Sequence, residues 1–189
     1  MMERFSDAKE IQHNKFADSP LGKSCKNIDL NKSPILEYKS LAIICDIYSH
    51  CPIENGDWTG KRGNSKWIPN EVYIPKKSNP EEKSWRDILK DYDIDGIEYK
   101  DGEPDFSSIS KGDVEIEDFS DNRDDNFDKA DIELAKQRGC SPKEVKEWRK
   151  ENKYTWHECK DMKTIQKVPS IVHNNMSHSG GISEVKKGV

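Results

Sequence analysis

The feature that most constrains the fold of this chain is the stretch YTWHECKDMKTIQKVPSIVHNNMSHSGG, residues 154–181. Residues 154–159 have the aromatic and β-branched content of a strand, and residues 164–168 alternate as a returning strand after a turn. The following Pro169-Ser170 pair ends that strand, and Ser170 is suited to cap a short helix over 171–176. The pattern therefore predicts a strand, a turn, a second strand and a helix.

Three of the five histidines lie in this stretch. His157 is at the end of the first predicted strand, His173 is inside the helix and His178 follows it. A hairpin with a helix packed across it can bring the three imidazoles to one point. Imidazole and carboxylate groups, here including Glu158, are ligands for divalent metals. A metal that polarises a phosphate oxygen, beside a base that takes a proton from water, suffices for phosphodiester hydrolysis.

Two other interpretations stay open. A structural zinc site would need four ligands, drawn from His157, Glu158 or Cys159, His173 and His178. Such sites usually contain cysteine pairs, and the five cysteines of this chain include no CxxC pair, which favours free thiols in a reducing compartment. A catalytically inactive, nuclease-like interaction protein would suit the acidic segment described below.

Composition indicates one domain with an extension. The chain has 189 residues, of which 32% are hydrophobic and 35% charged, so it is polar for a globular protein. No apolar run approaches the ~20 residues that span a bilayer, so we expect no membrane partner. The N-terminus has no apolar core, so we expect no secretory signal peptide.

The net charge of −5 is unevenly distributed. Residues 101–133 hold thirteen acidic and three basic side chains, whereas residues 141–189 hold ten basic and six acidic ones. The basic segment surrounds the histidines, where a polyanion would bind. The candidates for phosphate contact are Lys160, Lys163, Lys167, Arg149 and Arg123.

Residues 1–53 are expected to form an N-terminal extension of unknown role, including an apolar helix or strand at 41–47. Residues 54–189 are expected to form the functional domain. Residues 54–82 should be mostly loop, with a short strand at 71–74. A helix should begin over 84–89, and a strand at 96–99 should end at an Asp-Gly turn.

Two helices are expected to precede the histidine stretch. Residues 126–138 have apolar side chains at helical spacing and a glycine, Gly139, as a stop. The next helix should begin with the capping box at Ser141 and end near Asn152.

The motifs TWHE, IQKVPSIVH and HSGG resemble the HNH/endonuclease VII-like nucleases of bacterial polymorphic toxins, of the Trp-His-His or Trp-His-Glu type. This group is related to the DNase domains of colicin-like bacteriocins. The resemblance covers residues 154–183 and extends through 96–107 and 122–152. It implies an α+β fold with a ββα-metal (His-Me finger) core at 154–181, preceded by helices and short strands.

The same resemblance implies one divalent metal ion (Zn, Ni, Mg or Mn) and cleavage of DNA, with RNA as an open alternative. It also implies a toxin that is secreted or delivered into the cytoplasm of a target bacterium, and a cognate immunity protein as partner. In such nucleases two adjacent positions provide a metal ligand and a general base, and here these are His157 and Glu158. Two assignments stay open: His157 is the base and Glu158 faces the metal or holds the imidazole, or His157 binds the metal and Glu158 is the base or orients it. His173 and His178 correspond to metal ligands.

Overall fold

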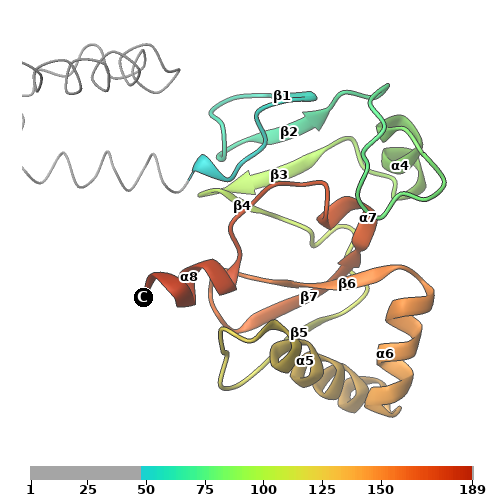
Figure 1. Ribbon diagram of the computed structural model, residues 1–189, viewed down its shortest axis with the longest axis vertical. Coiled ribbons are helices and arrows are strands. Elements are labelled where there is room, and N and C mark those ends of the chain that lie inside the picture. The colour runs from blue at the N-terminus through green and yellow to red at the C-terminus, as the bar shows by residue number, and fades with distance from the viewer. Residues whose placement is uncertain (1–47, 189) are drawn as a thin grey trace, which may run out of the picture. The chain divides into compact units, whose positions relative to one another are not determined.

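The computed structural model describes residues 48–188, which form an α+β fold as expected (Figure 1). The apolar segment at 41–47 and most of the proposed N-terminal extension lie outside the described residues. The described part contains two small antiparallel sheets, and helices flank both of them. None of its helices has the length and apolar character needed to cross a membrane.

The first sheet contains four strands in the order β1-β2-β3-β4. Their bounds are Gly56–Trp58, Lys66–Pro69, Ile97–Lys100 and Glu103–Pro104. The expected strand at 96–99 is confirmed as β3. The turn that follows it has positive φ at both Asp101 and Gly102, as a tight hairpin between β3 and β4 requires.

The expected strand at 71–74 is wrong, because these residues form a turn and an irregular segment outside the sheets. The strands lie earlier, at β1 and β2, in a segment whose Gly, Asn and Lys content indicated loop. Trp58 and Trp67 are paired across β1 and β2, with ring centroids 5.2 Å apart. This cross-strand aromatic contact stabilises a hairpin that local composition does not indicate.

Helix α4, Trp85–Asp91, packs beside the first sheet. Its capping box at Ser84 and Asp87 confirms the helix start expected from the sequence. Its buried face joins a core that also contains Val168, Val172 and Met176 from the C-terminal part of the chain. The first sheet and the histidine stretch therefore share one hydrophobic core.

The second sheet has the order β5-β7-β6, with bounds Asp113–Glu115, Thr164–Pro169 and Tyr154–Glu158 respectively. The β6–β7 hairpin confirms the two strands expected at 154–168, whereas β5 was not expected. Helices α5, Arg123–Arg138, and α6, Pro142–Glu151, pack beside this sheet (Figure 1). Both expected helices are confirmed, and α5 begins three residues early because Asn122 caps it.

Helix α7, Ser170–His173, follows β7 directly, and helix α8, Gly181–Lys187, ends the described chain. The expected Ser170 cap is wrong, since Pro169 is at the N-cap position and no side chain caps the helix. The helix is also shorter than 171–176. The Ser170 amide instead donates to the Lys153 carbonyl, 2.9 Å away, which ties the start of α7 to the residue before β6.

Candidate metal centre and active site

The three histidines of the C-terminal stretch meet at one point, although they come from three different segments. His157 lies on β6, His173 is the last residue of α7, and His178 lies in the loop before α8. Their ring centroids are 4.9 to 5.3 Å apart. One ring nitrogen from each lies within 4.8 Å of the others, a spacing at which one metal ion can bind all three.

Burial keeps the three imidazoles neutral. It lowers the pKa of His178 to about 3, and it lowers the pKa of His173 and His157 as well. The neighbouring histidines add to this effect at His157 and His178, because two positive charges so close together would repel each other. Neutral imidazole is the form that binds metal.

Hydrogen bonds orient two of the rings. His178 Nδ1 lies 2.7 Å from the Met176 carbonyl oxygen, and His173 Nδ1 lies 3.0 Å from the Asn174 side-chain oxygen. Because both oxygens only accept, each Nδ1 carries the proton and each Nε2 keeps a free lone pair. The two rings therefore present metal-binding nitrogens.

His157 has a buried nitrogen without a partner. Its Nε2 makes no hydrogen bond, and the nearest carboxylate oxygen is Glu103 Oε1, 3.9 Å away. Buried polar atoms are almost always hydrogen-bonded, so an orphaned one needs an explanation. Together with the neutral ring set, this atom fits a site built to hold a divalent cation.

A phenylalanine forms a wall of the histidine cluster. Phe106 is fully buried, and its ring centroid lies 4.9 Å from that of His157, 5.8 Å from His173 and 6.0 Å from His178. An apolar wall excludes water from one side of the cluster and holds the rings in place. Phe106 lies in a segment with no histidine or catalytic motif, and sequence reasoning gave it no role.

Glu158 is buried beside the histidines but is held by helix α5. Asn126 Nδ2 donates to its Oε1 over 2.8 Å, and Arg123 Nε donates to its Oε2 over 3.1 Å. Among the described residues, the groups able to share a metal do not include Glu158. The carboxylate therefore has a fixed orientation set by α5, and Asn126 is a site residue that the sequence did not reveal.

Gly180 allows the loop after His178 to approach the end of β6. A Cβ atom at Gly180 would lie 2.7 Å from the Glu158 carbonyl oxygen, closer than real contacts allow. Any side chain there would push the loop away from β6. His178 is near His157 partly because residue 180 is glycine.

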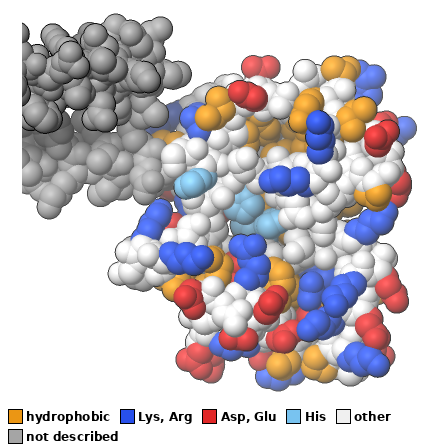
Figure 2. Space-filling view, viewed as in Figure 1, with side chains coloured by type: hydrophobic (Ala, Val, Ile, Leu, Met, Phe, Trp, Pro, Cys, Tyr) orange, Lys and Arg blue, Asp and Glu red, His pale blue; other side chains and the backbone are white. Residues whose placement is uncertain are grey.

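The histidines, Glu158 and Arg123 line a pocket of about 800 Å³. Figure 2 shows histidine side chains in a hollow of the surface, with Lys and Arg side chains around it. The basic residues that line this pocket are Lys77 and Arg123. Lys77 was not expected from the sequence.

Of the five residues expected to contact phosphate, Arg123 lines this pocket, whereas Lys160, Lys163, Lys167 and Arg149 do not. Arg149 forms a buried ion pair with Asp131, and Lys167 is buried with its ammonium 4.2 Å from the centre of the Trp148 ring. Burial lowers the pKa of Lys167 to about 8. Lys163 pairs with Glu115, and Lys160 donates to the Asp101 carbonyl. Their role in substrate binding stays a prediction, which the placement of Arg149 and Lys167 does not favour.

Residues 96–180 match a family model described as the DNase/tRNase domain of colicin-like bacteriocin. The match covers less than half of the chain but includes all three histidines, Glu158, Arg123 and Asn126. It confirms the resemblance to colicin-like nucleases over this segment. No curated protein and no solved structure gave a match. The description of the matched family covers nucleases that act on DNA or on tRNA.

Proposed function

We propose that residues 54–189 form a metal-dependent HNH-type endonuclease that hydrolyses DNA phosphodiester bonds. The observation that carries this proposal is the convergence in one pocket of three neutral imidazoles, one with an orphaned buried Nε2, all from the segment similar to colicin-like nucleases. The hairpin β6–β7 followed by α7 supports a ββα-metal core. Its biological role would be that of a bacteriocin or polymorphic toxin domain delivered into a target bacterium and inhibited by an immunity protein.

In this proposal His157, His173 and His178 hold one divalent ion, of Zn, Ni, Mg or Mn. When bound, the ion would stabilise the negative charge that develops on the phosphate and on the leaving oxygen. His157 is then a metal ligand, which leaves Glu158 as the general base that takes a proton from the attacking water. Asn126 and Arg123 orient this carboxylate, and the half-exposed guanidinium of Arg123 is placed to contact the phosphate.

A closed structural zinc site has less support. Cys159, with Glu103 and His157, forms a second group whose ligand atoms lie within 4.8 Å of one another. A cysteine binds zinc as a thiolate, but burial and nearby carboxylates raise the pKa of the Cys159 thiol. This environment opposes thiolate formation, and the three histidines alone leave a coordination position for water or phosphate.

The test is plasmid cleavage by the purified full chain with added Mg, Mn, Ni or Zn, compared with His157→Ala and with a chelator. We expect cleavage with at least one metal, and loss of cleavage in the variant and with the chelator. Lys90→Ala, on α4 and outside the pocket, is the matched control. Cleavage that survives His157→Ala, or no cleavage with any metal, would contradict the proposal. Parallel incubation with RNA determines which nucleic acid is preferred.

A further inference from the structure

The pocket extends well beyond the histidine cluster. Its other walls come from residues 49–55 and from Trp67, Tyr73, Pro75, Lys77 and Trp85, all of which lie outside the segment similar to colicin-like nucleases. A water-sized group occupies about 30 Å³. A metal ion with its ligands and one phosphate therefore fills only a small part of 800 Å³. The remaining space is large enough for a neighbouring part of a nucleic-acid strand.

Lys77 is the cation in this second part of the pocket. Its side chain is exposed, and none of the described carboxylates forms an ion pair with it. Lys66 and Lys83, by comparison, are paired with aspartates. Lys77 therefore offers a positive charge without an ion-pair partner among the described residues, at the pocket that holds the histidines.

The backbone at Lys77 is attached to the end of α7. Asn175 accepts from the Lys77 amide over 3.1 Å and donates to the Lys77 carbonyl over 2.6 Å. Asn174, next to His173, donates to the Ser78 hydroxyl over 2.8 Å. These bonds connect residues almost one hundred positions apart in the chain and hold Lys77 beside the segment that carries His173.

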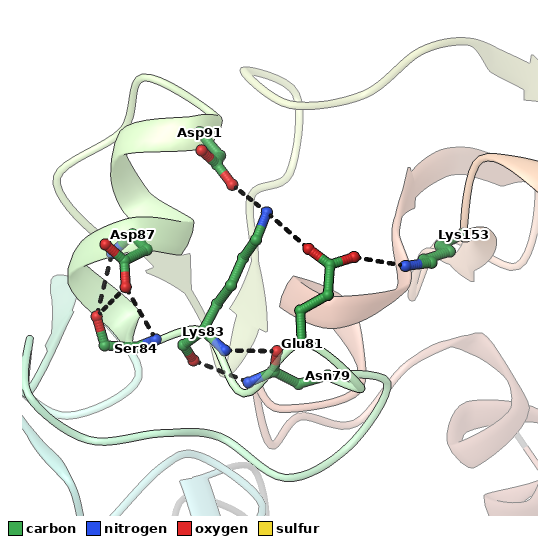
Figure 3. Close-up of polar contacts among 7 residues, drawn as sticks. All are labelled: Asn79, Glu81, Lys83, Ser84, Asp87, Asp91 and Lys153. Carbon is green, nitrogen blue, oxygen red and sulfur yellow. Dashed lines mark hydrogen bonds and ion pairs between the residues drawn. The ribbon is translucent and has the colours of Figure 1, made fainter.

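The loop around Lys77 is also closed at its ends, as Figure 3 shows for Asn79 and Lys83. The Asn79 side chain donates to the carbonyls of Pro75 and Lys83 and accepts from the Lys83 amide, each over 2.8 or 2.9 Å. Glu81 pairs with Lys153, which directly precedes β6. Because the backbone of this loop is already held, ligand binding should cost the conformational entropy of the Lys77 side chain but little of the loop backbone's.

We propose that Lys77 forms a second phosphate subsite, which binds the substrate strand at a phosphate next to the one that is cleaved. This inference rests on the proposed function. Each nucleotide of a strand adds one phosphate, so a strand with one phosphate at the histidines places others nearby. Arg123 enters the pocket from α5 and Lys77 from the loop between β2 and α4, so the two cations belong to separate elements that can contact separate phosphates.

The test measures binding of a short, fluorescently labelled DNA duplex by the full chain in a chelator, between about 50 and 200 mM salt. For Lys77→Ala we expect weaker binding at low salt. The logarithm of the association constant decreases linearly with the logarithm of the salt concentration, and we expect this dependence to become shallower by about 0.9, the value for one lost phosphate contact. Lys77→Arg should restore the slope, and Lys90→Ala should leave it unchanged. An unchanged slope in Lys77→Ala would overturn the subsite.

Cleavage measurements separate this inference from the proposed function. If the wild-type chain cleaves DNA and Lys77→Ala raises KM with little change in kcat, both are supported. If cleavage occurs but Lys77→Ala changes neither the slope nor KM, the subsite alone is wrong. If no metal supports cleavage but Lys77→Ala still loses one phosphate contact, the proposed function is wrong, and Lys77 contacts phosphate in a pocket that binds nucleic acid without cleaving it.

Discussion

Two buried polar clusters lie beside strand β6, and they differ in how their polar atoms are used. On one side, Asp131 accepts hydrogen bonds from Arg149, over 2.8 and 3.2 Å, and from the Trp156 indole, over 2.9 Å. On the other side are the three histidines, where His157 Nε2 has no partner. Trp156 and His157 are neighbours in sequence, and neighbouring side chains in a strand point to opposite faces.

The difference separates a structural cluster from a candidate site. In the Asp131 cluster the buried Arg149 guanidinium forms an ion pair with the Asp131 carboxylate, and the cluster joins α5, α6 and β6. The histidine cluster leaves a buried polar atom unsatisfied, which lowers stability unless a ligand provides the missing interaction. We therefore expect substitutions in the first cluster to affect folding and those in the second to affect metal binding and catalysis.

The largest effects are expected from two separate single substitutions, one at Asp131 and one at His157. Asp131→Ala leaves the Arg149 guanidinium buried without a partner, which should lower the free energy of unfolding by about 3–5 kcal/mol. His157→Ala should reduce cleavage by on the order of a thousand-fold, as loss of metal-assisted charge stabilisation of several kcal/mol implies. Chemical denaturation and plasmid cleavage measure the two quantities.

If the two clusters have these separate roles, neither substitution should produce the effect expected of the other. Metal-free His157→Ala should unfold at a denaturant concentration close to that of the wild type. Asp131→Ala, assayed at a temperature where it is folded, should keep most of its metal affinity. A large stability loss in His157→Ala with unchanged metal binding would show that the histidine cluster is structural.

Glu158→Gln tests the role of the residue beside His157. The amide keeps the size of the side chain and an acceptor oxygen, but it cannot act as a general base. We expect cleavage to fall by about a hundred-fold or more, while metal affinity stays near the wild-type value. Single-turnover cleavage and metal titration distinguish the two effects. A fall in metal affinity that accounts for the whole loss would instead identify Glu158 as a ligand or as a support for one.

Glu103→Ala tests the carboxylate nearest to the orphaned nitrogen. The Glu103 side chain is held by the Lys160 amide, 2.6 Å away, and its Oε1 lies 3.9 Å from His157 Nε2. Because Glu103 faces the same nitrogen that is left for the metal, its negative charge should favour a cation at that point, and residues that support a metal site commonly change metal affinity by about 10- to 100-fold. We expect a decrease in this range by calorimetric titration, and a similar decrease in Glu103→Gln, which keeps the size of the side chain but not its charge. Wild-type affinity in Glu103→Ala would exclude this electrostatic role.

Acid should destabilise the metal-free protein through the histidine cluster. The folded-state pKa values of His157, His173 and His178 lie below the ordinary value of 6.5, so the unfolded chain binds more protons as the pH falls. The free energy of unfolding should therefore decrease below about pH 6.5, by up to about 1.4 kcal/mol per pH unit for each imidazole. For His178 the decrease should continue towards pH 3.

Denaturation of the wild type and of His178→Ala, each measured from pH 7 down to about pH 4, provides the measurement. The variant should show a shallower decrease, because it lacks one of the groups that take up protons on unfolding. Equal slopes in the two proteins would contradict the assignment of the acid sensitivity to this cluster.

The smallest effect is expected for Lys163→Ala, at the exposed end of the hairpin. Lys163 pairs with Glu115 on β5, and both side chains are more than half exposed. Exposed ion pairs contribute about 0–1 kcal/mol, so the unfolding free energy should change by less than 1 kcal/mol. Cleavage should also be nearly unchanged, because Lys163 does not line the pocket. A large rise in KM would restore it as a substrate-binding residue.

The sequence predicted the helices and strands that depend on contacts between residues near each other in the chain, and it missed those that depend on distant contacts. Helix α6 was predicted closely because the Ser141–Glu144 capping box and Pro142 at the first helical position lie within four neighbouring residues. The β6–β7 hairpin was predicted from its local alternation. Strands β1 and β2 were missed because their pairing depends on Trp58 and Trp67 meeting across the sheet and on β3, thirty residues later.

The candidate site shows the same division. The sequence indicated His157, His173 and His178 because a short hairpin and the helix after it must bring nearby segments together. It could not indicate Phe106, Asn126 or Glu103, whose residue types are common and whose roles depend on where β4 and α5 pack. Arg149 was predicted from its charge alone, and only its buried contact with Asp131 revealed a different environment.

The sequence by itself determined the α+β character, the hairpin-helix order and the identity of the three histidines, since these follow from local periodicity, capping and the spacing of residues within a short segment. The tertiary structure decided which polar groups are satisfied and which are left to bind a ligand. It placed Glu158 in hydrogen-bonding contact with Arg123 and Asn126, and it joined the Lys77 loop by hydrogen bonds to the residues after α7. Such contacts depend on the packing of distant segments, and single-sequence patterns carry no record of that packing.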